Sequence, residues 1–563
     1  MGTSGLTANT ILSRLSHDML KRNYAAGYWR DDTLYALAQR HAQAHPDKCA
    51  VRDSYGTLSY GELVRMADRV ARELDAAGLK PGDRVAVWLP SRVEITVFVL
   101  ACSRNRYICC PSLHRNHTVA EILTLCERMA AAAFVGEAGY GADADRHDIF
   151  EKLGDRDYVR KVFKCAPRSA DGVDPALGLD GKPSTGREIS AIEQPDTVVY
   201  LAFTSGTTGE PKGVMHSDNT LLSNARELSS DWGLNSGSVI YTLSPLSHNL
   251  GFGAFTASIA CGSEVVLHDL PRTVSILERL REVGATFIFG VPAHAMDLLE
   301  EMRRTGADGL EKIEGFRISG AAVSSTIVEG LQAFGIKPQS GYGMTEACSH
   351  HYTRPNDPPE LISGSSGRSC DGYEVRIFSV SDPDEPVAPG TVGQIGGRGA
   401  SLMLGYFDNQ LATERSFNRS GWFMTGDLGW EDENGYLRIT GRIKDVIIRG
   451  GHNIHPAHME MLTMRHPSVE RAAAVPVKDE RLGEKVCLAV MPRKGQTINP
   501  EQLLSYLDRE GLSKYDMPEY FLSLDEIPLS ANGKILKREL LDPIQNGTLR
   551  PTPIRFQGSA RSA

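Results

Sequence analysis

The sequence predicts an α/β protein with a large N-terminal part and a smaller α+β part toward the C-terminus. A chain of 563 residues exceeds one hydrophobic core, so two or more domains are expected. Strand-like and helical runs alternate through the first part, which is typical of parallel sheets covered by helices. Beyond Gly396 the runs become shorter and turn-bounded. This change indicates a small β subdomain followed, from Lys444, by a compact α+β module.

The first hundred residues are expected to hold helices and one strand–helix unit. Residues 1–30 are a polar leader, which Tyr28 and Trp29 can anchor by burying aromatic area. Ser59 and Glu62 have the spacing of a capping box at the start of a helix. The expected elements are helices over Thr33–His45 and Ser59–Leu74, a strand over Arg84–Leu89 and a helix over Val93–Ser103.

The same alternation continues through the middle of the chain. The segment Ala166–Gly186 is rich in Gly, Pro, Asp and Ser and is expected to form a surface excursion. The run Thr197–Phe203 is β-branched and aromatic enough to be a buried strand. Further strands are expected over Val239–Leu243, Glu264–His268, Ala285–Gly290 and Phe316–Ser319, with helices over Ser275–Val283 and His294–Arg304.

The C-terminal part is expected to be built differently. The turn-bounded runs Gly421–Phe423 and Gly435–Ile439 indicate the β subdomain. The module after it is expected to hold strands over Val446–Ile448, Val469–Val477 and Lys485–Met491 and helices over Ala457–Met464 and Pro500–Asp508. The predicted divisions are a domain over 1–443, a domain over 444–545 and a polar, flexible tail over 546–563.

Composition argues against several classes of function. A net charge of −9 disfavours a nucleic-acid or anionic-membrane partner. No apolar stretch reaches membrane-spanning length, so no stable membrane anchor is expected. Ten scattered cysteines without metal-ligand spacing indicate reduced, mostly buried thiols in a cytoplasmic protein.

The first motif with chemical content is TSGTTGEPKGV, from Thr204 to Val214, directly after the strand expected to end at Phe203. Glycines, hydroxyl groups and a lysine on such a loop suit the binding of a polyphosphate. The loop is not a Walker motif, because Pro211 stands where the second glycine is required and Gly213 follows Lys212. The alternative is a mobile surface linker.

A second motif, GYGMTE, runs from Gly341 to Glu346. Tyr342 offers an aromatic face to a planar base, and the flanking Gly341 and Gly343 let that base approach the backbone. Glu346 is a hard oxygen ligand suited to Mg²⁺. The alternative is a simple turn that bears a solvent-facing carboxylate.

These two motifs, together with Ser319–Ala322, Thr425–Asp427, Gly441–Asp445 and Pro528–Lys534, resemble the motifs of the adenylate-forming superfamily. That superfamily comprises acyl-CoA synthetases and other AMP-dependent synthetases and ligases, stand-alone adenylation enzymes and luciferases. The resemblance implies a large N-terminal domain of two α/β subdomains plus a small β subdomain, followed by a small mobile α+β domain. It also implies ATP, Mg²⁺, a small-molecule carboxylic acid and coenzyme A as ligands.

The resemblance implies individual roles. Thr345 is expected to hold the α-phosphate and Glu346 the Mg²⁺ ion. Lys534 is expected to contact the acid and the α-phosphate during adenylation, and Lys444 matches the hinge. The expected contacts to ATP or coenzyme A are Thr204, Ser205, Gly206, Thr207, Thr208, Gly209, Lys212, Gly320, Ala321, Ala322, Tyr342, Asp427, Arg442, Gly450 and Gly451.

The acid pocket is expected after the strand that ends near Leu243. His248 matches a ring that borders the pocket in the family and can control its entrance, although a lone histidine at a strand end is more often structural. An asparagine at the position of Asn249 resembles the sequence of stand-alone enzymes that activate hydroxylated benzoates. The expected pocket residues are His248, Asn249, Gly253, Gly341, Gly343 and Met344. Two other segments, Gly27–Arg30 and Ala101–Arg104, resemble ligases of cyclic or aromatic acids.

The leading hypothesis is therefore an ATP-dependent acid–CoA ligase for a cyclic, aromatic or other small to medium acid. The first alternative is a stand-alone adenylation enzyme that loads a carrier-protein thiol. A luciferase-like oxygenase shares the motifs, and a degenerate ATP sensor or scaffold is the non-enzymatic alternative. The groups that such a sensor would have lost are all present, namely Lys212, Glu346, Asp427, Arg442 and Lys534.

Overall fold

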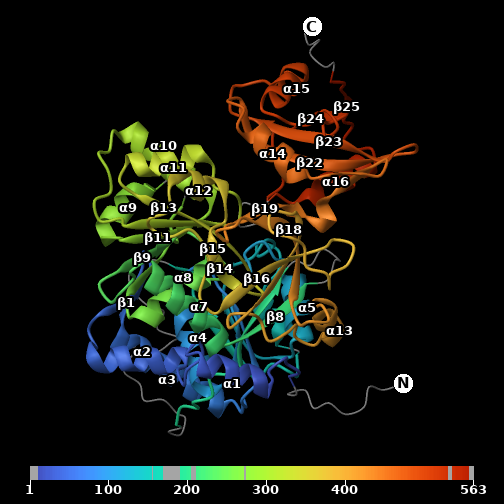
Figure 1. Ribbon diagram of the computed structural model, residues 1–563. Coiled ribbons are helices and arrows are strands. Elements are labelled where there is room, and N and C mark those ends of the chain that lie inside the picture. Colours follow the sequence, from blue (N-terminus) through green and yellow to red (C-terminus); the bar gives the residue numbers. More distant parts are fainter. Residues whose placement is uncertain are drawn as a thin grey trace, which may run out of the picture. The chain divides into compact units, whose positions relative to one another are not determined.

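A computed structural model describes residues 11–154, 156–168, 190–204, 211–271, 274–529 and 535–556. The chain divides into two compact units (Figure 1). Unit 1 comprises residues 1–375 and 397–417, and unit 2 comprises residues 376–396 and 418–563. This division describes compactness, whereas the boundary predicted at Lys444 concerns movement and stays a prediction.

The first sheet of unit 1 is mostly parallel. Its strands run in the order β6 (Lys161–Cys165), β5 (Ala131–Glu137), β3 (Arg84–Trp88), β4 (Ile108–Cys110), β7 (Val198–Thr204) and β8 (Lys212–Ser217). The strands β6 to β7 pair in parallel, and β8 returns antiparallel along β7. The strand expected before the glycine-rich motif is therefore β7, buried between β4 and β8.

The second sheet of unit 1 has nine strands. Its order is β15 (Arg368–Ser369), β14 (Cys348–Tyr352), β13 (Lys337–Met344), β12 (Gly315–Ser319), β11 (Phe287–Gly290), β9 (Val239–Thr242), β10 (Glu264–Leu267), β1 (Cys49–Arg52) and β2 (Thr57–Ser59). From β13 to β1 every pairing is parallel. The carboxyl ends of these strands therefore meet at one edge of the sheet.

Helices cover both sheets. They are α1 (His17–Ala25), α2 (Leu34–Ala44), α3 (Tyr60–Ala76), α4 (Glu94–Asn105), α5 (Val119–Arg128), α6 (Ile149–Leu153), α7 (Asp218–Asp231), α8 (Asn249–Cys261), α9 (Ile276–Val283), α10 (Pro292–Thr305), α11 (Ser325–Ala333), α12 (Pro359–Gly364) and α13 (Gln410–Arg415). The predicted capping box at Ser59 and Glu62 is present at the start of α3. Figure 1 shows α9, α10 and α11 together beside β9, β11 and β13. The apolar side chains of these helices share one core with side chains of β9, β10, β11 and β12.

A four-stranded sheet joins the units along the chain, with the order β16 (Tyr373–Phe378), β17 (Gly393–Gly399), β18 (Phe423–Glu431) and β19 (Leu437–Arg442). The rest of unit 2 contains η2 (Ile443–Asp445), α14 (Pro456–Met464), α15 (Pro500–Arg509), α16 (Lys537–Gln545) and a further sheet. That sheet has the order β21 (His452–Ile454), β20 (Ile447–Arg449), β23 (Gly483–Pro492), β24 (Tyr520–Ser523) and β25 (Thr552–Pro553), and β22 (Val469–Asp479) also pairs with β23.

Alternation along β22 explains how this sheet is covered on both faces. Ala472 and Ala474 face the core that α14 and α15 complete. Ala473 and Val475 face the opposite core, which α16 completes. A period of two places successive side chains on opposite faces, so an almost continuous apolar run is what a doubly covered strand requires.

The C-terminal segment differs from the expected flexible tail. Thr552 and Pro553 form β25, which pairs antiparallel with β24. Ile554 and Phe556 pack against the core beside α14 and α15. Burial of these apolar side chains stabilises the docked segment. The polar residues on either side of them make the segment look like a flexible tail in the sequence.

A buried carboxylate joins three helices of unit 1. Asp218 Oδ1 accepts hydrogen bonds from the Leu34 backbone N–H (2.9 Å) and from Ser103 Oγ (2.9 Å). Its Oδ2 pairs with Arg106 Nη1 at 2.5 Å, and both side chains are almost fully buried. The start of α2, the end of α4 and the start of α7 therefore depend on one charge pair.

We expect Asp218→Ala to destabilise unit 1 by ~3–5 kcal/mol, because Arg106 would be left as an unpaired buried charge. Urea unfolding and hydrogen exchange in α2 would measure the effect. Glu282→Ala is the matched control, since Glu282 is 67% exposed and its pair with Arg279 should contribute less than ~1 kcal/mol. Equal stability of the two variants would contradict the assigned role of Asp218.

Candidate active site

The predicted site residues of unit 1 gather where the strands of the two sheets end. Gly320 follows β12, and Thr345 and Glu346 follow β13. His248 and Asn249 stand at the start of α8, shortly after β9. Because β9, β12 and β13 run parallel, these residues lie along the same edge of the nine-stranded sheet.

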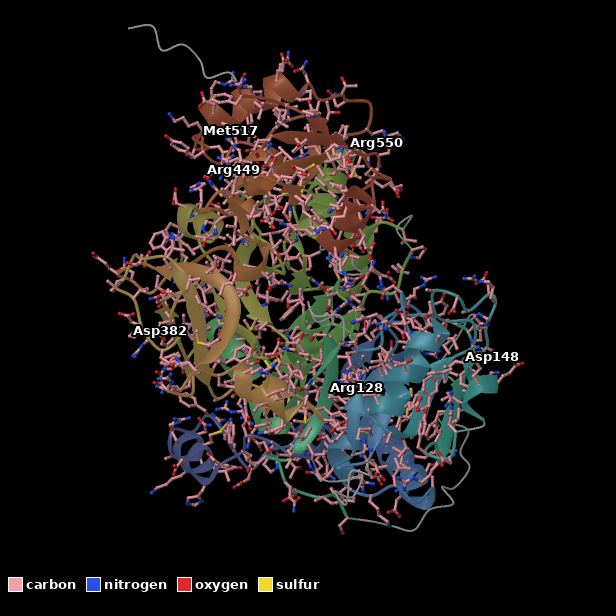
Figure 2. All side chains as sticks on the ribbon, turned by 90° about the vertical axis from the view of Figure 1, so that its right-hand side faces the viewer. Arg128, Asp148, Asp382, Arg449, Met517 and Arg550 are labelled. Atoms are coloured by element: carbon pink, nitrogen blue, oxygen red, sulfur yellow. The ribbon has the colours of Figure 1, made fainter. Side chains whose placement is uncertain are left out.

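The glycine-rich motif connects β7 to β8. Thr204 and Lys212 are paired at the base of this connection, and Thr204 Oγ1 donates to the Lys212 carbonyl (3.4 Å). Arg128, labelled in Figure 2, donates to the Pro211 carbonyl and so holds the start of β8. Five predicted phosphate-loop residues lie outside the described residues, namely Ser205, Gly206, Thr207, Thr208 and Gly209.

Tyr406 links the two chemical motifs. Its hydroxyl donates to Glu346 Oε1 at 3.0 Å. The ammonium of Lys212 lies over the Tyr406 ring, with Nζ 4.6 Å from the ring centroid. Tyr406 is 5% exposed, and burial and then the Glu346 charge raise its pKa, so the phenol keeps its proton and acts as the donor. A lysine from one motif and a carboxylate from the other are thus brought to one side chain.

The backbone around Tyr406 is bonded to both sheets. Met403 N–H donates to the Glu346 carbonyl (2.7 Å), and Ser401 Oγ donates to the Ala347 carbonyl (3.1 Å). On the other side, Phe407 N–H donates to the Gly213 carbonyl (2.7 Å). A Cβ at Gly213 would lie 3.1 Å from the Phe407 Cβ, so this close approach favours glycine.

His216, on β8, fixes the backbone of Thr345. His216 Nε2 lies 2.7 Å from the Thr345 carbonyl, which can only accept, so Nε2 carries the proton. Burial lowers the pKa of His216 to about 4, and the ring is therefore neutral. Its Nδ1 then accepts from Thr220 Oγ1 at 3.0 Å. This chain of bonds ties the turn that bears Thr345 and Glu346 to β8 and α7.

Two buried histidines contact the ring of Tyr342, the residue predicted to bind a planar base. Its ring makes edge contacts with His350 (centroids 5.1 Å apart) and His351 (6.4 Å). Their Nδ1 atoms are 2.8 Å apart, and burial lowers the pKa of both rings. A Cβ at Gly343 would lie 2.1 Å from the Cys348 carbonyl, so a side chain there would push β14 away.

A small cavity lies beside this edge. It has a volume of about 10 Å³, enough for roughly one water centre. Its walls come from α7, α8 and the start of β14, and the lining residues are Leu221, Asn224, Asn249, Phe252, Gly253, Thr256, Cys348 and Ser349. Two predicted pocket residues, Asn249 and Gly253, are therefore part of one wall. Asn249 Nδ2 also donates to the carbonyl of Met344, a third predicted pocket residue, at 3.4 Å.

Three imidazole rings stack next to this wall. His248 lies on His114 with ring centroids 4.1 Å apart, and His114 lies on His117 at 5.5 Å. His114 Nδ1 is 3.1 Å from Ser247 Oγ. Burial lowers the pKa of His114 to about 4, and burial followed by the His114 charge lowers the pKa of His248 well below its usual value. The rings are therefore neutral, and His248 is held by aromatic contacts.

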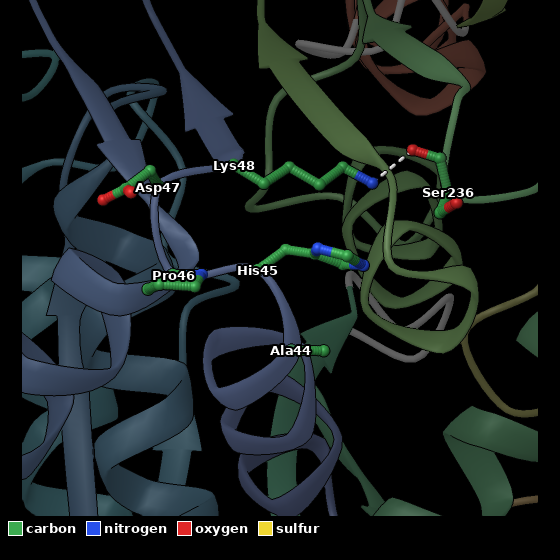
Figure 3. A pocket seen from close by; sticks show the side chains of 6 residues that line it. All are labelled: Ala44, His45, Pro46, Asp47, Lys48 and Ser236. Atoms are coloured by element: carbon green, nitrogen blue, oxygen red, sulfur yellow. Dashed lines mark hydrogen bonds between the residues drawn. The ribbon is translucent and has the colours of Figure 1, made fainter.

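A larger hollow of about 460 Å³ lies elsewhere in unit 1 (Figure 3). It is formed by Ala44–Lys48, before β1, and by Ser236, before β9. The strands run parallel, so this hollow lies at the opposite edge of the sheet from Glu346. Lys48 is held there by the carbonyls of Ser236 and Gly262, and none of the predicted site residues lines the hollow.

In unit 2, Asp427 and Arg442 stand opposite each other on β18 and β19, with Arg442 Nε 2.8 Å from Asp427 Oδ1. Lys444 lies in η2, and burial and then the Arg442 charge lower its pKa. Gly450 and Gly451 form the tight turn between β20 and β21 with positive φ at both residues. The predicted adenylation lysine, Lys534, lies outside the described residues.

The residues present fit a Mg²⁺ ion that is bound together with a nucleotide. No group of three or more His, Cys, Asp or Glu that could hold a metal ion occurs within the described ranges. Mg²⁺ commonly takes one or two carboxylates and completes its shell with phosphate oxygens and water. One oriented carboxylate, Glu346, near the base of the predicted phosphate loop matches that pattern.

Some contacts were not predicted from the sequence. Tyr406 follows a Gly-rich stretch that matches no motif for phosphate or metal binding. His216 resembles an ordinary strand residue. The two segments that resemble ligases of cyclic or aromatic acids make structural contacts. Trp29 Nε1 donates to the Ala400 carbonyl (2.9 Å), and Arg104 Nε pairs with Asp68 at 2.7 Å. The preference for cyclic or aromatic acids stays a prediction.

Comparison with known proteins identifies the family. The family described as AMP-binding enzyme matches residues 38–407, and the AMP-binding enzyme C-terminal domain matches residues 458–534. The chain is 31% identical over 517 residues to a medium-chain fatty-acid–CoA ligase of Escherichia coli, covering 91% of this chain and 90% of the relative. It is 30% identical over 546 residues to a salicyl-AMP ligase / salicyl-S-ArCP synthetase of Mycobacterium tuberculosis, covering 92% of each chain.

A solved structure shares the fold. The o-succinylbenzoate coenzyme A synthetase of Bacillus subtilis, in complex with ATP and magnesium ion, superposes with a TM-score of 0.77 at 27% identity. The match covers 90% of this chain and 99% of that structure. Among the helices that the structure describes, none combines the length and apolar composition needed to cross a bilayer. On sequence and fold alike, the chain belongs to the AMP-binding enzyme family and is an adenylate-forming enzyme.

Proposed function

We propose that the protein is an ATP-dependent acid–CoA ligase that activates a cyclic, aromatic or other small to medium carboxylic acid. The observation that carries the proposal is the meeting of Lys212 and Glu346 at Tyr406. At Tyr406 a cation from β8 meets a carboxylate that follows β13 and is suited to a metal ion, and the edge of the sheet that contains β13 also carries a cavity with polar and apolar walls. The named relatives include a fatty-acid–CoA ligase and a salicyl-AMP ligase, which use different acids and different acceptors. The choice of acid and acceptor is therefore part of the proposal.

In the proposed first half-reaction, a carboxylate oxygen of the acid attacks the α-phosphorus of ATP and pyrophosphate leaves. Lys212 and the loop before it bind the phosphates, and Thr345 orients the α-phosphate. A Mg²⁺ ion held by Glu346 would supply charge neutralisation at the phosphates. In the second half-reaction, a thiol sulfur attacks the carbonyl carbon, its proton is released, and AMP leaves. Both steps depend on positioning and charge stabilisation.

Lys534 is proposed to serve the first half-reaction and the Gly450–Gly451 turn the second, with Lys444 as the hinge between the two arrangements. Asp427 and Arg442 are proposed to bind the ribose. Their pairing supports this role, since a carboxylate already fixed by an arginine accepts hydrogen bonds in a defined direction.

The chemistry of the cavity walls supports an acid that combines apolar surface with a polar group. Its walls combine Phe252 and Leu221 with the amides of Asn224 and Asn249. Asn224 is occupied with the backbone of Ser349, at 3.1 and 3.2 Å. Asn249 uses its Nδ2 on Met344, so its Oδ1 is the acceptor that can meet a polar group of the acid. The alternative acceptor is a carrier-protein thiol, as the salicyl-S-ArCP synthetase activity of one relative suggests.

A panel of carboxylic acids tests the function directly. We expect acid-dependent release of pyrophosphate from ATP with Mg²⁺, and sustained turnover only when coenzyme A is added. A carrier protein that replaces coenzyme A at lower concentration would favour the alternative acceptor. Absence of acid-dependent pyrophosphate release and of acyl-AMP across short, ring-bearing and long-chain acids would refute the proposal.

Lys534→Ala should slow acyl-AMP formation by ~100-fold or more, as expected for the loss of a preorganised charge at the transition state. Thioester formation from supplied acyl-AMP should persist. The two half-reactions are measured separately, with the exposed Lys494 changed to Ala as the control. If both half-reactions fall together in a folded Lys534→Ala protein, the role assigned to Lys534 is wrong.

Gly253→Ala should narrow the cavity without disturbing the fold. A Cβ at this helical position meets no atom within 4 Å, and alanine should stabilise α8 by ~1 kcal/mol. We expect kcat/KM for the bulkiest accepted acids to fall by ~10-fold or more, with the KM for ATP unchanged. Gly364→Ala is the matched control, because its Cβ is equally unobstructed but lies on α12. An unaltered ranking of acids would place Gly253 outside the acid pocket.

A further inference from the structure

Tyr406 occupies a fixed position between groups that belong to different sheets. Its backbone N–H donates to Thr413 Oγ1 at 2.9 Å, and the residue forms an isolated antiparallel bridge with Val214 on β8. The phenol is therefore anchored from its own backbone. Its hydroxyl reaches Glu346, after β13, while its ring face lies under the ammonium of Lys212, on β8.

We propose that Tyr406 is a positioning residue that holds the Glu346 carboxylate and the Lys212 ammonium in the arrangement that receives the nucleotide's phosphates and metal ion. The proposal rests on the proposed function of this site. It adds a role for a side chain that touches neither reacting atom and acts through two that bind the nucleotide.

The two contacts of Tyr406 differ in strength, and this difference suits a binding site. The hydrogen bond to Glu346 joins a buried donor to a charged acceptor, so it should keep that oxygen in place. The contact with Lys212 is a cation–π interaction with a partly exposed ammonium, which is weaker and leaves the flexible lysine able to turn toward a phosphate. Tyr406 thus fixes the Glu346 carboxylate, whereas it holds the Lys212 ammonium only loosely.

A purely structural role is the competing explanation. Tyr406 is also buried beside β8 and bonded to α13, so its ring contributes to the core of unit 1. A structural hydroxyl would show its loss in the stability of the protein without ligands. A positioning hydroxyl would show it in the response to ATP and Mg²⁺.

Tyr406→Phe separates the two explanations, because it keeps the ring and the contact with Lys212 but removes the bond to Glu346. Without ligands, we expect an almost unchanged melting temperature. The gain in melting temperature that ATP with Mg²⁺ gives the wild type should shrink. The Mg²⁺ concentration for half-maximal pyrophosphate release should rise roughly tenfold, the effect of losing one hydrogen bond to a charged group. The KM for the acid should stay the same.

Tyr158→Phe is the matched control. The Tyr158 hydroxyl is buried and has no hydrogen-bond partner among the described residues, so its removal should leave every one of these measurements unchanged. Glu346→Gln supplies the second test. If Tyr406 acts through Glu346, Tyr406→Phe should add little to the loss of Mg²⁺ response already seen in Glu346→Gln, whereas independent effects would multiply.

The outcomes distinguish this proposal from the function on which it rests. A wild-type protein whose melting temperature does not respond to ATP with Mg²⁺ would overturn both. A normal wild-type response that Tyr406→Phe retains in full would overturn the role of Tyr406 alone. The same holds for a Tyr406→Phe protein that loses stability without ligands while its Mg²⁺ dependence stays at the wild-type value.

Discussion

The candidate site depends on one constraint, namely that the chain from Ser401 to Phe407 is hydrogen-bonded to both sheets of unit 1. Met403 holds the turn that carries Glu346, and Phe407 holds the strand that carries Lys212. His216 adds a second tie between that strand and the turn, through the Thr345 carbonyl. These backbone bonds bring a lysine and a carboxylate that are more than a hundred residues apart in the chain to the same side chain, Tyr406.

Much of the fold could be predicted because its signals are local. The capping box at Ser59, the apolar strand before the glycine-rich motif and the alternating strands and helices of the middle part are properties of short stretches. The doubly covered strand β22 is also visible as a continuous apolar run. Pairing is not local, and for this reason β25 at the C-terminal end went unforeseen.

The site was predictable to a different extent. Glycine, threonine, lysine and glutamate in fixed spacing indicate phosphate and metal chemistry, so the motifs nominate Lys212, Thr345 and Glu346 as candidate site residues. Tyr406 and His216 act by contact with those residues, and such a contact depends on how two sheets pack. Gly27–Arg30 and Ala101–Arg104 likewise build buried contacts of unit 1, which their sequences do not reveal.

The motif residues and the cavity residues are proposed to contact different parts of the substrates. Residues at the strand ends are proposed to contact phosphates, a metal ion and a carboxylate, groups that every adenylation reaction shares, so their chemistry does not vary with the acid. The cavity is built from α7, α8 and the start of β14, whose side chains can change without moving a strand end. A chain can therefore be about equally similar to a fatty-acid–CoA ligase and to a salicyl-AMP ligase. Under the proposed function, the choice of acid is a property of helix faces, whereas the activation chemistry is a property of sheet edges.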